Sequence, residues 1–207
     1  TALSTSDGMS LTLAGIEVAN LTGDYFANLF FVTGWGVDVT HTATLDGAGG
    51  TDFVDTLFAN DDVATITLTD TLLSRTGMGA VNLVNIEDVI LASGGAGANA
   101  FDVSAFTLGT VTMTGGAGID IFTGSATRLT DIVQETLAAA AITLTDISLS
   151  DGATTDALAN IDVANITGDA TDNTFTVSGW TGSGTLNGLG DATDDVIVAS
   201  KDADFTL

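Results

Sequence analysis

The chain has 207 residues, a formal net charge of −24 and only three basic side chains, Arg75, Arg128 and Lys201. Nucleic acids and anionic lipids attract Lys and Arg, so this balance argues against both as partners. The absence of cysteine excludes disulfides and thiolate metal sites, whereas an apolar content of 45% is enough for a continuous core. No apolar run is long enough to span a membrane, so we expect no membrane insertion.

In chain order, the sequence shows short stretches in which apolar and polar residues alternate, as in half-buried β-strands. Clusters of Gly, Asp, Asn and Ser separate these stretches and predict turns. One segment, residues 129–140, fits either a turn or two of helix or a longer rung of stacked strands with small inward residues. The alternating stretches lie at residues 11–13, 65–69, 110–114, 141–145 and 195–198.

The sequence repeats itself. Residues 16–35 and 161–180 are identical at twelve of twenty positions with a constant offset of 145. A third, more distant copy begins at Ile86. Repetition on this scale indicates a stacked-repeat architecture. We expect two sets of inward-facing residues to recur in phase, followed by aromatic corners: Phe30, Phe101 and Phe175; Val32, Val103 and Val177; and then Trp35, Phe106 and Trp180.

These observations predict an all-β fold, a right-handed parallel β-solenoid or β-helix built from about three homologous modules. The turns are long, rich in glycine and similarly spaced, which favours parallel stacking over hairpins with two-residue Asn-Gly turns. The chain contains no proline, as suits strands that are nearly all paired. We expect one continuous array over residues 1–207, with modules of roughly 1–70, 71–146 and 147–207.

The two ends continue the same pattern. Residues 201–207 resemble residues 61–68, and residues 1–4 match residues 71–74, so two residues of the repeat are missing between the end and the start. The chain therefore reads as mature or excised. We expect its partners to be other copies end to end, or the continuation of a longer parent chain.

One nine-residue segment carries recognisable chemistry. Residues 115–123 read GGAGIDIFT and fit the pattern G-G-x-G-x-D-x-U-x at every defined position. Glycines let main-chain carbonyls approach one ion closely, and a carboxylate supplies charge. Ligation by oxygen alone suits a hard cation such as calcium.

This segment resembles the haemolysin-type calcium-binding repeats of secreted bacterial RTX proteins. The chain also looks like the long repeat regions of bacterial surface-layer proteins and giant adhesins. The resemblance implies an extracellular or cell-surface location, with Asp120 as a calcium ligand and Phe122 as the buried residue. In that family the motif recurs twice in each turn of the roll. In this chain it recurs once in each turn, and only one copy is complete.

The incomplete copies place other residues at the ligand position. They are Asn99, Asp52, Asn28, Asn173, and either Asp194 or Asp195. If ions bind, they should lie between paired turns: 94–99 with 115–120, 47–52 with 23–28, and 188–195 with 168–173. The alternative is that these turns are metal-free Asn/Asp-Gly corners.

The function that this pattern favours is structural: a surface-layer element, an adhesin stalk or a head-to-tail fibre subunit, and not an enzyme. The alternative functions are a glycan-binding adhesin face at Trp35 or Trp180, a polysaccharide-active β-helix enzyme, and an ice-binding surface of Thr-x-Thr runs. Ice binding requires the threonines at 65–67, 110–112 and 143–145 to share one flat face.

Overall fold

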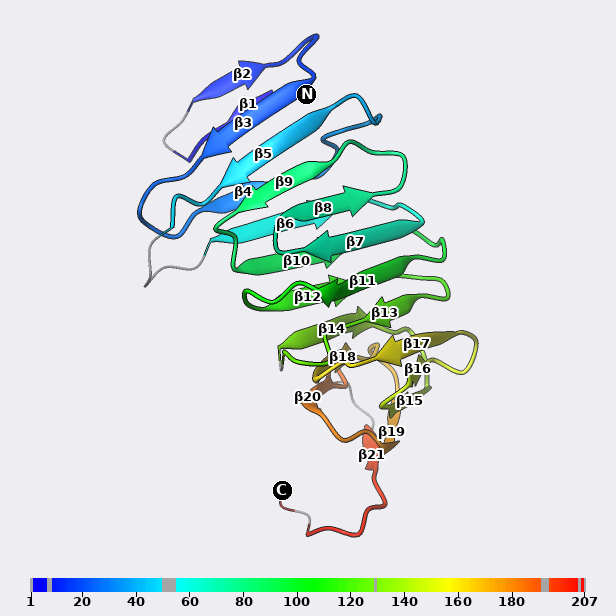
Figure 1. Cartoon of the computed structure of the whole chain (residues 1–207). Helices are drawn as coiled ribbons and strands as arrows, with labels where there is room; N and C mark the ends of the chain where they lie inside the picture. Colours follow the sequence, from blue (N-terminus) through cyan, green and yellow to red (C-terminus); the bar gives the residue numbers. More distant parts are fainter. Residues whose placement is uncertain are drawn as a thin grey trace.

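The computed structural model describes residues 2–6, 9–49, 55–128, 130–190, 194–204 and 206. Within these residues the chain forms 21 strands and no helix, which confirms the all-β prediction. The strands lie in two large sheets and one separate hairpin. Figure 1 shows the strands stacked along one direction, with the two termini at opposite ends of the stack.

The smaller of the large sheets has seven strands, and every neighbouring pair is parallel. Consecutive rungs of the stack supply these strands, as in a β-helix. From the C-terminal end they are β20 (Ser183–Asn187), β18 (Val163–Thr167), β14 (Asp131–Thr136), β12 (Val111–Thr114), β10 (Asp88–Ala92), β6 (Thr56–Asn60) and β4 (Leu29–Phe31).

The larger sheet has twelve strands and mixes parallel with antiparallel pairs. In the same direction its strands are β21 (Val196–Val198), β19 (Thr174–Gly179), β15 (Ala141–Thr145), β16 (Ser148–Ser150), β17 (Thr155–Ala159), β13 (Ile121–Thr123), β11 (Ala100–Ala105), β7 (Thr65–Thr69), β8 (Leu72–Arg75), β9 (Val81–Val84), β5 (Thr42–Asp46) and β3 (Val18–Thr22).

The expectation of purely parallel stacking is wrong at two places, where the chain folds back on itself within the larger sheet. We call β7–β8–β9 and β15–β16–β17 the two meanders, because each runs through three successive antiparallel strands. Both begin with the same five residues, Ile-Thr-Leu-Thr-Asp, at 66–70 and 142–146. The first turn of each has two residues without glycine, and the hydroxyls of Thr69 and Thr145 accept a main-chain N–H there, each at 3.3 Å.

The separate hairpin lies at the N-terminal end and contains β1 (Ala2–Ser4) and β2 (Ser10–Thr12), which pair antiparallel. Leu3 faces Leu11 across it. Residues 129–140, which the sequence leaves open between a short helix and a longer rung, contain strand β14, while Leu129 lies outside the described residues.

One hydrophobic core lies between the two large sheets and draws side chains from both. Parallel pairing places equivalent side chains in columns, for example Ile66, Phe101, Phe122 and Leu158 in the larger sheet. The rings of Phe101 and Phe122 stack with their centroids 5.2 Å apart and their planes 11° apart. The predicted inward phenylalanines and valines of the three repeats all belong to this core or pack against it.

The two sheets differ in length because the meanders add strands to only one of them. Between the rungs β9/β10 and β11/β12, the larger sheet inserts β8 and β7, while β10 and β12 are direct neighbours in the smaller sheet. At about 4.8 Å per strand, each meander adds roughly 10 Å to one side. From this difference in length we expect the stack to bend, with the seven-stranded sheet on its inner side.

Candidate functional site

Residues at the predicted ligand positions stand immediately before the strands, where they form hydrogen bonds between rungs. The N–H of Asn99 donates to Asp120 Oδ1 at 2.7 Å, and the N–H of Asp120 donates to Asp156 Oδ1 at 2.8 Å. We call Asn99, Asp120 and Asp156 the corner ladder. The N–H of Asn173 donates to Asp195 Oδ1 at 2.9 Å in the same way.

The structure therefore brings two of the three expected pairs of turns together, 94–99 with 115–120 and 168–173 with 188–195. Both alternatives near the C-terminus are exposed, and Asp195 is the one that accepts the Asn173 N–H. The third pair cannot be placed as predicted, because Asp52 lies outside the described residues. At that corner Asn28 donates its N–H to Asp55 Oδ1 at 2.7 Å.

The asparagines also bond backward to the preceding rung. Asn99 Nδ2 donates to the Val63 carbonyl at 2.7 Å, and Asn173 Nδ2 donates to the Ala139 carbonyl at 3.0 Å. Each buried asparagine thus links three successive rungs: its N–H donates to a carboxylate of the next rung, and its side-chain amide donates to a main-chain carbonyl of the preceding one. This role is structural and requires no metal.

Except at Gly94, the first glycine of the motif copies packs against the side chain that stands at the ligand position. A Cβ on Gly115 would lie 2.3 Å from Asp120 Oδ2, and one on Gly168 would lie 2.0 Å from Asn173 Oδ1. The same relation holds for Gly47 and Asp55, at 2.2 Å. Asp55 is therefore the residue that sequence reasoning missed at this corner. The longer spacing, Gly47 to Asp55, concealed it.

The interior behind the corner ladder is acidic. Glu135 on β14 is only 2% exposed and accepts hydrogen bonds from the turn at Gly115. Burial raises the pKa of Glu135 to about 8, and the nearby charge of Asp156 adds to this shift. Burial likewise raises the pKa of Asp156 to about 6 and shifts the pKa of Asp120 upward. Neither Glu135 nor Asp156 stands in the repeat motif, so the motif alone did not reveal them.

These groups fit a hard cation in part. Asp120 Oδ2 and Asn99 Oδ1 are buried and have no hydrogen-bond partner, which leaves two oxygen acceptors at this corner. Main-chain carbonyls of Ser93 and Gly95 lie against the neighbouring turn at Gly116. Within the described ranges, no three or more His, Cys, Asp or Glu side chains form a group that could hold a metal ion. Any ion here would rely on amide and main-chain oxygens for most of its ligands.

Arginine and lysine side chains each donate a hydrogen bond to the main-chain carbonyl of an aromatic corner residue. Arg75 Nη2 donates to the Trp35 carbonyl at 2.9 Å, and Arg128 Nη1 donates to the Phe106 carbonyl at 2.6 Å. Lys201 Nζ donates to the Trp180 carbonyl. Trp35, Phe106 and Trp180 are the equivalent aromatics of the three repeats, so each repeat places a cation at its aromatic corner.

The two tryptophans offer little ring surface to a ligand. Trp180 is 8% exposed and donates its Nε1–H to the Ser183 carbonyl at 3.2 Å. Trp35 is partly buried against the core. The Thr-x-Thr runs also do not share a face, because β7 and β15 lie in the larger sheet while β12 lies in the smaller one.

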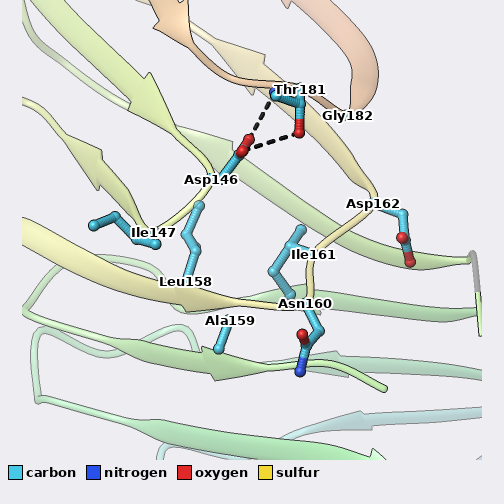
Figure 2. A pocket seen from close by; sticks show the side chains of 9 residues that line it. All are labelled: Asp146, Ile147, Leu158, Ala159, Asn160, Ile161, Asp162, Thr181 and Gly182. Atoms are coloured by element: carbon cyan, nitrogen blue, oxygen red, sulfur yellow. Dashed lines mark hydrogen bonds between the residues drawn. The ribbon is translucent and has the colours of Figure 1, made fainter. Parts of the chain in front are cut away.

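An open hollow of about 550 Å³ lies between the second meander and the loop after β19 (Figure 2). Asp146 and Asp162 contribute carboxylates to its lining. Thr181 donates both its N–H and its hydroxyl to Asp146, at 2.6 and 2.9 Å (Figure 2). Asp162 Oδ2 accepts the N–H of Asp131 at 3.2 Å. Both carboxylates are thus already engaged in holding rungs together.

No family model, curated protein or solved structure matches this chain. The described residues include no helix that is long and apolar enough to cross a membrane.

Proposed function

We propose that this chain is a structural module of a secreted or cell-surface bacterial protein, and that it works by stacking end to end with further copies. In this proposal its two large sheets belong to a right-handed β-solenoid of about three homologous modules. Resemblance to RTX and surface-layer repeats supports the location. The distribution of exposed apolar side chains supports the stacking.

The observation that carries the proposal is a core column that runs out at the end of the stack. Ile197 on β21 continues the column of Phe175, its partner in the parallel pair. Phe175 is 2% exposed, whereas Ile197 is 60% exposed. End strands also leave main-chain groups unpaired, which is a template for further strands. A second stack placed on this end would bury the Ile197 side chain and pair the free main-chain groups.

The test uses two matched substitutions of isoleucine by lysine. Ile197→Lys places a charge at the open end, while Ile121→Lys places the same charge on β13 in the middle of the stack, where Ile121 is 49% exposed. Analytical ultracentrifugation should show concentration-dependent oligomers for the wild type and for Ile121→Lys, and a loss of oligomers for Ile197→Lys. A wild-type chain that stays monomeric at every concentration would refute the proposal.

A calcium ion at the corner ladder is a second candidate function, favoured by the unpartnered Asp120 Oδ2 and Asn99 Oδ1. A ligand that binds only the folded chain stabilises it, by about 2.7 kcal/mol at a concentration one hundred times its Kd. Calcium should therefore raise the Tm of the wild type and leave that of Asp120→Asn unchanged. Asp202→Asn, which removes an exposed carboxylate, should respond like the wild type. No calcium effect on the wild type would exclude the ion.

A further inference from the structure

We propose that copies join by exchanging a strand: residues 203–207 of one copy pair with the β1–β2 hairpin of the next copy and complete a third meander there. This inference rests on the end-to-end stacking proposed above and specifies how the junction forms. The occupant of the hairpin edge is thus a second copy of this chain.

The β1–β2 hairpin matches the second and third strands of the two complete meanders. Leu3 faces Leu11 across it, as Leu73 faces Val81 in the first meander. The turn that follows each hairpin has the same left-handed backbone, with φ of 65° at Gly15, 52° at Asn85 and 54° at Asn160. These three residues are equivalent in the repeat.

Among the described residues, no strand lies beside this hairpin in the place of the first strand of a meander. β8 and β16 each lie between two partners, whereas β1 pairs with β2 alone in the described part of the chain. Leu11 on β2 is 49% exposed, although Val81, which takes the corresponding place in β9, is fully buried. The open edge of β1 is where β7 or β15 lies in the complete meanders.

The C-terminal residues have the sequence of that missing strand. Residues 203–207 read ADFTL, and the first strands of the two meanders read ATITL at 64–68 and AAITL at 140–144. The alanine, threonine and leucine are identical in all three, and phenylalanine replaces isoleucine. Phe205 and Leu207 lie outside the described residues, and their match to the meander strands is one of sequence.

Residues 203–207 cannot reach the β1–β2 hairpin of their own copy. The termini lie at opposite ends of the stack (Figure 1), and the larger sheet alone has twelve strands. Twelve strands at about 4.8 Å extend over roughly 50 Å. The residues after Val198 can reach at most about 30 Å when fully extended.

The exchanged strand would also provide pairing partners for the two end strands of the seven-stranded sheet. The first strand of each meander pairs in parallel with the second strand after that meander, so that Ile66 lies beside Phe101 and Ile142 beside Phe175. Phe30 on β4 is the equivalent of these phenylalanines, and β4 is an end strand of its sheet. The exchanged strand would lie between β1 and β4, and β2 would reach β20 of the donor copy, the other end strand.

Disulfide trapping tests the register, because the chain contains no cysteine. Thr67 faces Ser74 in the first meander, so Thr206 should face Ser4 of the next copy. Antiparallel partners are close enough for a disulfide. Oxidised Thr206→Cys/Ser4→Cys should run as a ladder of covalent oligomers on a non-reducing gel. Thr67→Cys/Ser74→Cys should close within one chain and run as a monomer.

An out-of-register control is Thr206→Cys with Ser10→Cys. Ser10 is the partner of Ser4 on β2, one strand further away, beyond the distance that a disulfide spans. This pair should give no ladder. Deleting residues 203–207 should weaken the association at least tenfold and leave the Tm of the subunit unchanged.

Two results would overturn the exchanged strand, and they are distinguishable. If the wild type associates but Thr206→Cys/Ser4→Cys gives no ladder and the deletion associates normally, the stacks join in another way and the proposed function survives. If the wild type does not associate at all, both proposals fail.

Discussion

The guanidinium of Arg128 lies over the ring of Phe106, 5.1 Å from its centroid, while its Nη1 donates to the carbonyl of the same residue. The contact therefore combines a cation–π interaction with a main-chain hydrogen bond. Since the equivalent corners use Arg75 and Lys201, all three basic side chains of the chain help to hold the repeat together.

Replacing Arg75 should lower the free energy of unfolding substantially. Arg75 is buried, pairs with Asp61 and also donates to the Val32 carbonyl. The variant Arg75→Met would leave the Asp61 carboxylate without its counter-charge, which typically costs about 3–5 kcal/mol. Urea denaturation should show this loss. The double variant Arg75→Met/Asp61→Asn should recover much of it, and a double variant no better than the single one would contradict the ion pair.

The acidic interior makes stability depend on pH. A folded-state pKa of about 8 for Glu135, against 4.5 in the unfolded chain, means that the folded state binds the extra proton between these values. Stability should therefore fall as pH rises from about 5 to 8, because the unfolded state then loses protons first. At about 1.4 kcal/mol per pKa unit, the effect is on the order of 4 kcal/mol.

The variant Glu135→Gln supplies the control for this pH dependence. It keeps an acceptor for the Gly115 N–H but cannot ionise, so its stability should vary less between pH 5 and pH 8 than that of the wild type. Free energies of unfolding from urea titrations at the two pH values give the comparison. Equal slopes for the two proteins would show that Glu135 is not the titrating group.

Two glycines at the same motif position should respond differently to alanine. A Cβ on Gly115 would lie 2.3 Å from Asp120 Oδ2 and 2.9 Å from the Phe122 ring, whereas one on Gly94 would meet only Asn60 Oδ1 at 3.7 Å. Overpacking of this kind costs about 1–3 kcal/mol. Gly115→Ala should lower the Tm clearly, and Gly94→Ala should leave it unchanged or raise it slightly. The reverse order would mean that the corner geometry is not as described.

Association should strengthen with salt, because each copy carries a net charge of −24. The Debye length shortens from about 30 Å at 0.01 M to about 8 Å at 0.15 M ionic strength, which screens the repulsion between copies. Light scattering at fixed protein concentration should therefore rise with NaCl. Calcium chloride at equal ionic strength separates screening from specific binding. Weaker association at higher salt would indicate that charged contacts form the junction.

Much of the fold could be predicted from the repeat, because equivalent residues in stacked rungs share one environment. The inward column of Phe101 and the pairing of Asn99 with Asp120 follow directly from that equivalence. The meanders could not be predicted, since the Asp70–Thr71 turn lacks the glycine that usually marks a two-residue hairpin. Glu135 escaped notice because an acidic residue at an inward strand position does not follow the hydrophobic pattern.

The repeat also conceals a change of sheet. The two most similar segments, residues 16–35 and 161–180, contain the strands β3 and β18. However, β3 lies in the twelve-stranded sheet and β18 in the seven-stranded one. In the described residues the first repeat has four strands from β3 to β6, which precedes its meander, whereas the second has five from β10 to β14, which precedes the other meander. Sequence similarity identifies equivalent rungs, but only the count of strands between them determines on which side each one lies.

The unequal lengths of the two sheets have a consequence for any filament. Both internal meanders lie on the same side and curve the subunit in one direction. A meander completed between copies would adjoin β4 and would therefore lengthen the opposite side. The curvature would be partly cancelled at every junction, and the fibre would be straighter than the subunits that compose it.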